Sequence, residues 1–364
     1  MQRQIYVTGD YSPVKEFFES QNFKKIFLVC DTSYRYLKIS ALFESMDNIV
    51  KFSDFSPNPD YESVKKAVSL FHEKGCDSIL AVGGGSAIDL AKCVKLYANM
   101  DKGEEYIKQK PIANSISLTA MPTTAGTGSE ATRYAVIYYN GEKQSITHDS
   151  IIPSTVIFDA SALETLPEYQ KKATMLDALC HSIESFWSVN STNESKEYSR
   201  QAIKLIIDNM NAYLDNNPQV NEKMFRAANI AGKAINITQT TAGHAMCYKL
   251  TSLYGIAHGH AAAMCVRKLL PYMVSNTDKC IDNRGKDYLN NTFNQLAEAM
   301  GCGNTDELCE KLEEIYGSMD FAEPEYSEED ITVLTNSVNP VRLKNNPVAL
   351  DLYTIEDLYR QILA

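Results

Sequence analysis

The order of apolar and polar positions divides this chain into two parts with different repeats. Up to about residue 160, short continuous apolar runs alternate with segments in which apolar residues recur at helical spacing. Continuous apolar runs of strand length are typical of parallel strands that are buried on both faces. The first part is therefore predicted to be an α/β domain, a parallel sheet with helices on both faces. The expected strands are residues 25–30, 49–52, 78–82, 116–121, 134–139 and 155–158, and the expected helices are residues 12–18, 61–74 and 87–98.

After Pro167 the pattern changes, and apolar residues recur at helical spacing almost to the end of the chain. We therefore predict a first domain over residues 1–162 and an all-α second domain over residues 163–364. Local signals refine the elements: Ser12 is typical of an N-cap, and Asn140-Gly141 of a tight turn. The acidic run at 323–330 is predicted to be a solvated loop.

Charge and composition argue against several classes of protein. The net charge of −11 disfavours a general binder of nucleic acid or of anionic membrane surfaces. No run of about twenty apolar residues occurs, so no transmembrane helix is expected, and the first residues lack the apolar region of a signal peptide. The nine cysteines are scattered without a CxxC pair, which favours reduced thiols in a cytoplasmic protein.

Two loops that contain glycine follow predicted strands. The first, GGGSAID at residues 83–89, lies between a strand and a helix, where glycine lets the backbone approach a phosphate and helix-start amides point at it. The second, PTTAGTGSE at residues 122–130, is rich in hydroxyl groups. Each could instead be an ordinary turn. Because both follow parallel strands, together they indicate a dinucleotide at the carboxyl edge of the sheet.

Asp31 follows the first predicted strand and has two possible roles. Its carboxylate could accept a hydrogen bond from a ribose hydroxyl, and its charge would then repel a 2′-phosphate, which favours NAD(H) over NADP(H). It could equally be the N-cap of the next helix.

Polar residues in an otherwise apolar helical segment indicate a second site. Asp177 and His181 are four residues apart in the segment MLDALCHSIESFW, so their side chains lie on one face of the predicted helix. Three of the chain's six histidines, His244, His258 and His260, lie close together further along. One carboxylate with two or three imidazoles is a ligand set for a divalent metal. An Asp–His pair at this spacing can also be a surface hydrogen bond, but in an apolar helix both groups need buried partners.

Together these motifs resemble the iron-containing (group III) alcohol dehydrogenase family over nearly the whole chain. The resemblance rests on Asp31, Pro57-Asn58-Pro59, the two glycine loops and the segments that contain Asp177 and His258-Gly259. It implies an N-terminal dinucleotide-binding domain and a helical C-terminal domain, with metal and substrate in the cleft. The metal ligands that it implies, for Fe²⁺ or Zn²⁺ alike, are Asp177, His181, His244 and His258. The cofactor contacts that it implies are Asp31, Asn58, Gly84, Gly85, Ser86, Asp89, Thr123, Thr124, Thr127, Thr132 and Lys143.

Two positions depart from the pattern of the family. Many members carry a second histidine four residues after the third ligand, where this chain has Tyr248. Lys233 stands where the family usually has an apolar residue, and Asn236 and Thr238 follow it. A cation with nearby hydrogen-bond donors suits an anionic substrate group, although a lysine here can also extend along its helix to solvent.

Three segments of the second half, FWSVNST, AGKAIN and LTSLYGIAHGH, are similar to the members that reduce phosphonoacetaldehyde. The resemblance implies reduction of phosphonoacetaldehyde to 2-hydroxyethylphosphonate. Asp31 favours NAD(H) as the cofactor, the cysteines favour the cytoplasm, and a homodimer is expected as the commonest oligomer. The proton would reach the product oxygen through water, Tyr248, His260 or a ribose hydroxyl. Three other interpretations stay open: an alcohol or polyol dehydrogenase for another small substrate, a synthase of the dehydroquinate type, and a nucleotide-binding protein without activity.

Overall fold

The structure is a computed structural model that describes residues 2–338 and 340–364. The chain forms two compact units, one that ends at Pro167 but also takes in Asp215–Phe225, and one of Glu168–Leu214 with Arg226–Ala364. The sequence pattern places a boundary between residues 162 and 163. It does not predict that Asp215–Phe225 belongs to the first unit. Within Asp215–Phe225, the side-chain amide of Asn221 donates to the carbonyl of Ala160 at 3.0 Å, and the ring of Phe225 lies 5.7 Å from that of Phe158.

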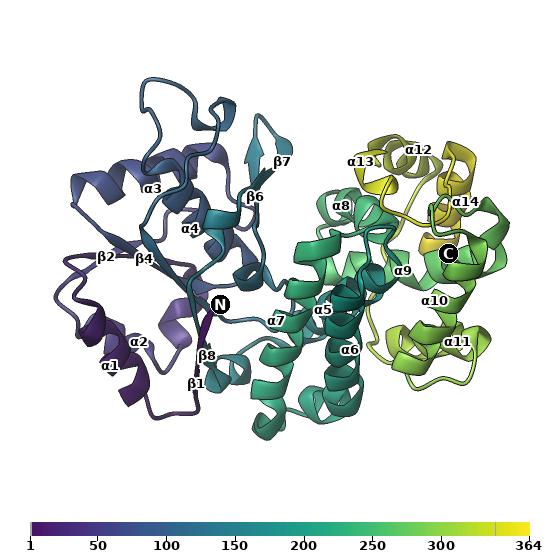
Figure 1. The fold of residues 1–364 in the computed structure, drawn as a ribbon, viewed down its shortest axis with the longest axis horizontal. Helices are drawn as coiled ribbons and strands as arrows, with labels where there is room; N and C mark the ends of the chain where they lie inside the picture. Colours follow the sequence, from purple (N-terminus) through teal and green to yellow (C-terminus); the bar gives the residue numbers. More distant parts are fainter. Residues whose placement is uncertain (1, 339) are drawn as a thin grey trace. The chain divides into compact units, whose positions relative to one another are not determined.

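A parallel sheet forms the centre of the first unit (Figure 1). Its strands are β1 (Arg3–Val7), β2 (Ile26–Cys30), β3 (Ile49–Phe52), β4 (Ser78–Gly83), β5 (Ser117–Pro122) and β8 (Thr155–Asp159). They lie in the order β1-β8-β5-β4-β2-β3, and every neighbouring pair is parallel. All residues of β2, β4 and β8 are buried, as expected for apolar strands that are covered on both faces. The predicted α/β fold class of this part is confirmed.

Two strands form a separate antiparallel hairpin, β6 (Tyr134–Tyr139) and β7 (Glu142–Thr147). Asn140 and Gly141 connect them with positive φ angles of 52° and 78°, so the tight turn predicted from this dipeptide is confirmed. The sequence pattern does not predict β1 or β7. Both mix polar and apolar residues, because one lies at an edge of the large sheet and the other in a half-exposed hairpin.

The helices α1 (Ser12–Gln21), α3 (Tyr61–Glu73) and α4 (Gly85–Tyr97) match predicted ones with small differences at their ends. The short helix α2 (Ser40–Glu44) was not predicted. The expectation that Ser12 is the N-cap of α1 is wrong, because Tyr11 occupies that position and Ser12 is already helical. α4 begins at Gly85, two residues earlier than predicted, so that Ser86 lies in its first turn.

The second unit is helical, as predicted, and no helix in the described part of the chain is long and apolar enough to cross a membrane. Its helices are α5 (Glu168–Trp187), α6 (Asn193–Leu214), α7 (Asn221–Thr238), α8 (Ala242–Tyr254), α9 (His258–Ser275), α10 (Lys286–Ala299), α11 (Thr305–Gly317), α12 (Glu328–Ser337), α13 (Pro340–Leu343) and α14 (Leu352–Leu363). The acidic run was expected to be a loop throughout, but its last three residues form the first turn of α12. Ser327 and Asp330 cap that turn reciprocally.

Candidate metal centre and phosphate-binding loops

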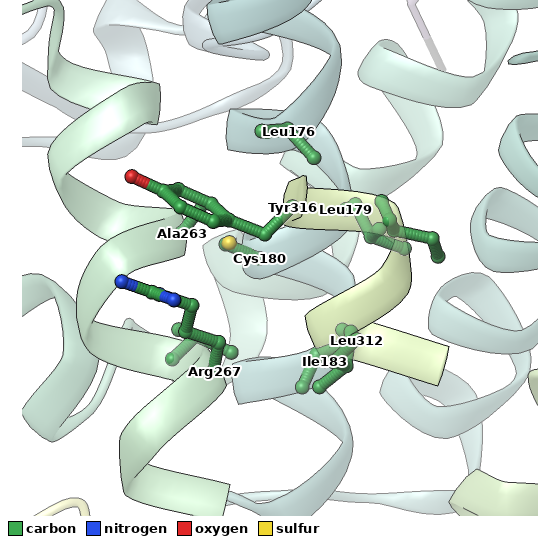
Figure 2. Close-up of a pocket in the computed structure, with 10 residues that line it drawn as sticks. Leu176, Leu179, Cys180, Ile183, Ala263, Arg267, Leu312 and Tyr316 are labelled. Atoms are coloured by element: carbon green, nitrogen blue, oxygen red, sulfur yellow. The ribbon is translucent and has the colours of Figure 1, made fainter. Parts of the chain in front are cut away.

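Helix α5 carries polar residues on one side and apolar residues on the other. Asp177, His181 and Glu184 follow one another at helical spacing, and they are only 2%, 5% and 0% exposed. Leu179 and Ile183 belong to a different side of the helix, which lines a cavity of about 20 Å³ against α9 and α11 (Figure 2). The apolar side fixes α5 in the core, and this packing holds the polar side in place.

Three of the four ligands implied by the sequence converge in the second unit. One ligand atom from each of Asp177, His244 and His258 lies within 4.8 Å of the others. The His244 Nε2 atom is 3.4 Å from Asp177 Oδ1, and both atoms are buried without a hydrogen-bond partner in the part of the chain that the structure describes. Buried polar atoms rarely stay unpaired because desolvation is unfavourable. The cluster therefore fits a divalent cation.

His181 lies beside this cluster and outside the set of mutually close atoms. Its Nε2 atom is 3.8 Å from Asp177 Oδ1, and its ring stacks on the ring of His244 with centroids 4.6 Å apart. A rotation of the side chain is enough to change which ring nitrogen faces Asp177. His181 as a fourth ligand remains a prediction.

The charges around His244 favour a cation at this position. Burial alone would lower the pKa of His244, but the carboxylates of Glu184 and Asp177 raise it to about 10. Burial likewise acts to raise the pKa of Asp177, and the neighbouring histidines hold it below its usual range. In the metal-free protein a proton on His244 therefore balances two buried carboxylates, and a divalent ion can take the place of that proton.

Sequence reasoning missed Glu184, whose fully buried carboxylate contacts the Nδ1 atom of His244. The signal was available, because Glu184 follows Asp177 by seven residues and His181 by three, which places all three on one side of a helix. A buried glutamate in an apolar helix needs a partner as much as a buried aspartate does.

Two side chains of α8 lie beside the ring of His258. The ring of Tyr248 is parallel to that of His258 within 6°, with centroids 5.5 Å apart. The Sγ atom of Cys247 lies 3.6 Å from His258 Nδ1. Tyr248 is therefore adjacent to the cluster, and its part in proton transfer remains a prediction.

His260 is buried in a chain of hydrogen bonds that its sequence position does not reveal. The backbone N–H of Ala257 donates to the Tyr169 hydroxyl at 2.8 Å, and that hydroxyl is 3.1 Å from His260 Nδ1. His260 Nε2 is 3.0 Å from the Tyr316 hydroxyl, which donates to Glu323 at 3.2 Å. Both ring nitrogens are thus engaged within the protein, which makes His260 a support for the start of α9.

The environment of His260 predicts a dependence of stability on pH. Burial, followed by the charge of Arg267, lowers the pKa of His260 to about 4 from an unfolded value near 6.5. The neutral ring stabilises the fold fully above about pH 6.5, and this contribution is lost as the pH falls towards 4. Between pH 7 and pH 4.5 the loss corresponds to about 2.5 kcal/mol. Urea unfolding of the metal-free protein should show that His260→Asn lacks this part of the acid destabilisation. An equal pH dependence in the two proteins would contradict the assignment.

The three residues predicted to bind the substrate lie on α7. Lys233 and Asn236 are half-buried and three residues apart, so they share one side of the helix. Thr238 is fully buried, and its hydroxyl is 3.0 Å from Ser185 on α5 and 2.8 Å from the carbonyl of Gln239. The hydroxyl of Thr238 is therefore used to hold the end of α7, while Lys233 and Asn236 stay candidates.

In the first unit, the two glycine loops follow neighbouring strands, since β4 pairs with β5 along its whole length. Gly84 is the N-cap of α4, so the first amides of this helix begin at the loop. A Cβ atom on Gly85 would lie 3.1 Å from the Thr127 side chain, which shows how closely the loops approach each other. The Ser86 hydroxyl accepts from the backbone N–H of Asn58 at 3.0 Å. The two loops thus lie together at one edge of the sheet, and phosphate binding there stays a prediction.

Asp31 lies at the same edge and caps a short helix, as one of its two predicted roles requires. Its Oδ1 atom accepts from the backbone N–H of Ser33 at 2.8 Å, and its Oδ2 atom is 3.4 Å from the Gly84 nitrogen. A Cβ atom on Gly83 would lie 2.7 Å from Asp31 Oδ2. The carboxylate therefore lies directly against the first glycine loop, where the ribose contact remains a prediction.

Two other predicted cofactor contacts are bonded within the protein. Asp89 accepts from the Ser129 hydroxyl at 2.5 Å and from the Val136 N–H at 2.9 Å. The buried ammonium of Lys92 donates to Ser129 at 3.0 Å and to Thr132 at 3.1 Å. These groups fix the second loop against α4. The remaining predicted contacts are Thr123 and Thr124 in the second loop and the half-buried Lys143 on β7.

Comparison with known proteins agrees with this arrangement. The iron-containing alcohol dehydrogenase family matches residues 2–160, and the C-terminal domain of the Fe-containing alcohol dehydrogenase family matches residues 171–363. Aldehyde-alcohol dehydrogenase 2 of Entamoeba histolytica is 31% identical over 72% of this chain, which spans only 33% of that protein. Phosphonoacetaldehyde reductase of Streptomyces viridochromogenes is 30% identical over 72% of this chain and 70% of its own length. 1,3-Propanediol dehydrogenase of Citrobacter freundii is 31% identical over 78% of this chain and 74% of its own length.

The fold is shared with solved structures. Sulfoacetaldehyde reductase of Bifidobacterium kashiwanohense, in a crystal structure with NAD⁺, superimposes with a TM-score of 0.88 at 24% identity. The match covers 100% of this chain and 97% of that chain. Both family matches together span nearly all of the sequence, so the chain belongs to the iron-containing alcohol dehydrogenase family.

Proposed function

We propose that this chain is a metal-dependent, NAD(H)-linked dehydrogenase that reduces a short aldehyde with an anionic group, with phosphonoacetaldehyde as the preferred substrate. The observation that carries the proposal is the convergence of the buried Asp177 and His244 with the half-buried His258 in a member of this family. A protein that only binds nucleotides has no use for a cluster in which two buried atoms, Asp177 Oδ1 and His244 Nε2, lack a hydrogen-bond partner among the described residues.

Asp177, His244 and His258, with His181 as the fourth ligand, would hold Fe²⁺ or Zn²⁺. Such an ion supplies a Lewis acid for a carbonyl oxygen when it is bound. Asp177 contributes the only negative charge of this ligand set, and burial of the side chain strengthens its attraction for a cation. The surrounding helices keep the ligands in place before any ion arrives, which lowers the entropy that binding must overcome.

NAD(H) would bind at the edge of the sheet that carries the two glycine loops, and it supplies the hydride. The backbone of Gly84 and Gly85 would lie against the diphosphate, as the start of α4 directs its first amides there. Thr124 and Thr127 flank these glycines and offer hydroxyl groups. The charge of Asp31 beside this loop would repel a 2′-phosphate, which favours NAD(H).

The proposal of an anionic substrate rests on Lys233 and on the relatives within the family. Lys233 and Asn236 share one side of α7, whose last residue is anchored on α5 by the hydrogen bond between Thr238 and Ser185. Among the relatives, the Streptomyces protein is a phosphonoacetaldehyde reductase, and it matches at 30% identity. A lysine beside amide donors is suited to a phosphonate dianion.

The assay that tests this function follows the oxidation of NADH by the protein reconstituted anaerobically with Fe²⁺ or Zn²⁺. Phosphonoacetaldehyde, sulfoacetaldehyde and propionaldehyde differ at one end, which is doubly charged, singly charged or neutral. We expect kcat/KM to decrease in that order. Turnover of none of these aldehydes would overturn the proposed reaction.

Lys233→Ala should raise KM for phosphonoacetaldehyde by about tenfold to a hundredfold, because a charged hydrogen bond contributes roughly 1.5–3 kcal/mol. KM for propionaldehyde should change less than about twofold, since that substrate has no group for the lysine. Lys223→Ala, at an exposed position in the first turn of α7, is the matched control. Equal increases for both aldehydes would remove Lys233 from the phosphonate site.

A second candidate is oxidation or reduction of an uncharged diol or its aldehyde, which the identity to 1,3-propanediol dehydrogenase favours. It uses the same metal and cofactor sites and has no need of Lys233. A higher kcat/KM for 1,3-propanediol or propionaldehyde than for the anionic aldehydes would select this function.

A further inference from the structure

The carboxylate of Glu184 is fully buried and contacts one short segment, the start of α8. Its Oε1 atom accepts from the backbone N–H groups of Thr241 at 3.1 Å and His244 at 3.2 Å, and from the Thr241 hydroxyl at 2.6 Å. Its Oε2 atom contacts His244 Nδ1. One carboxylate from α5 thus holds both the backbone and the ring of His244.

These contacts replace an ordinary helix cap. Thr241 is the N-cap of α8, yet its side chain accepts no capping hydrogen bond, and Glu184 receives the first N–H groups instead. The Thr241 hydroxyl also accepts from the indole N–H of Trp187 at 2.8 Å. A carboxylate at a helix N-terminus is favourable for the helix dipole as well.

The carboxylate of Glu184 lies closely against Gly243 in the first turn of α8. A Cβ atom on Gly243 would lie 2.9 Å from Glu184 Oε1 and 2.7 Å from a methyl carbon of Val266. The absence of a side chain at Gly243 is therefore what lets the carboxylate reach the start of the helix. Its two oxygens are fixed on separate partners, one on the backbone and one on the ring.

The two nitrogens of the His244 ring consequently face two different carboxylates. Nδ1 faces Glu184, while Nε2 is 3.4 Å from Asp177 and has no hydrogen-bond partner in the described residues. A carboxylate that accepts a hydrogen bond from Nδ1–H keeps the proton on Nδ1 and leaves the lone pair on Nε2. This is the form of histidine that binds a metal through Nε2.

We propose that Glu184 is a positioning residue that orients the His244 ring and keeps its proton on Nδ1, so that Nε2 is presented to the metal. The inference rests on the proposed metal site and names the residue that prepares one of its ligands. Glu184 itself does not contact the ion.

The test measures the affinity of the full-length protein for Zn²⁺ alone, by competition with a chromophoric chelator at fixed pH and without substrate or cofactor. Glu184→Gln keeps the shape of the side chain, but its amide donates towards Nδ1 and so favours a proton on Nε2. We expect Zn²⁺ affinity to decrease by about tenfold to a hundredfold.

Thr241→Val is the control for a purely structural role, because it removes the 2.6 Å hydrogen bond to Glu184 without touching the ring of His244. It should lower the melting temperature of the metal-free protein and leave Zn²⁺ affinity within about twofold. If both variants lose stability and neither loses affinity, Glu184 only caps α8 and the inference is overturned.

A spectroscopic measurement on the wild-type protein tests the inference even if the variants fail to fold. Long-range ¹H–¹⁵N spectra of the Zn²⁺-loaded protein should show His244 protonated at Nδ1 and coordinated through Nε2. Coordination through Nδ1 would overturn the inference while leaving the metal site intact. Failure of the wild-type protein to bind Zn²⁺ or Fe²⁺ would instead overturn the proposed function, and with it this inference.

Discussion

Replacing Asp177 with asparagine should abolish retention of the metal and lower kcat/KM for the aldehyde by about a thousandfold. The substitution keeps the shape of the side chain and removes the negative charge of the ligand set. Loss of Lewis-acid stabilisation by several kcal/mol corresponds to a decrease of this size. Metal content after gel filtration and NADH oxidation with saturating Zn²⁺ or Fe²⁺ measure the two effects separately.

Ser182→Ala is the matched control on the same helix. Ser182 is fully buried in α5 like Asp177, but its hydroxyl donates to the carbonyl of Ala178 one turn earlier and takes no part in the cluster. This variant should keep its metal and its activity. An Asp177→Asn protein that retains one equivalent of metal and full activity would place the metal elsewhere.

The sequence predicts the sheet well where strands are buried on both faces, because such strands are continuous apolar runs. Residues 25–30, 78–82 and 155–158 were predicted to within one residue of the ends of β2, β4 and β8, and all residues of these strands are buried. The strand β1 was not predicted, since its residues alternate in exposure at the edge of the sheet. The pairing of the hairpin strand β7 is set by the turn at Asn140, and its own residues carry little apolar signal.

At the candidate site, the sequence identifies ligand types and misses the residues that hold them. Chemistry and spacing pointed to Asp177, to His181 and to three later histidines, and the structure brings ligand atoms of Asp177, His244 and His258 together. Glu184 was missed although its spacing places it on the same side of the helix as Asp177 and His181, because its partner His244 lies 60 residues further along the chain. His260 has the signature of a functional histidine, but tyrosine hydroxyls flank both of its ring nitrogens. Such partners come from distant segments and can be recognised only in the fold.

Gly259 illustrates how the backbone itself sets the geometry of the cluster. It follows His258 in the first turn of α9, and a Cβ atom there would lie 2.0 Å from the carbonyl oxygen of Ala173 and 2.7 Å from the Cβ atom of Asp177. Both Ala173 and Asp177 belong to α5. The two helices that carry these ligands therefore touch at the position where one residue has no side chain.

Gly259→Ala should consequently destabilise the protein and weaken its metal site together. The added methyl group meets the backbone of α5, which cannot rotate aside, so α9 must shift; overpacking of this kind lowers the free energy of unfolding by about 1–3 kcal/mol. The shift separates His258 from Asp177, and we expect Zn²⁺ affinity to fall by at least about tenfold. Urea unfolding of the metal-free protein and chelator competition measure the two losses.

Gly317→Ala separates this steric effect from the general consequences of replacing glycine in a helix. A Cβ atom at Gly317, the last residue of α11, meets no atom within 4 Å, so alanine there should leave stability unchanged or raise it by up to about 1 kcal/mol. If Gly259→Ala were as stable as Gly317→Ala and bound Zn²⁺ normally, α5 and α9 could separate without disturbing the ligands. The close approach of the helices would then have no part in assembling the metal centre.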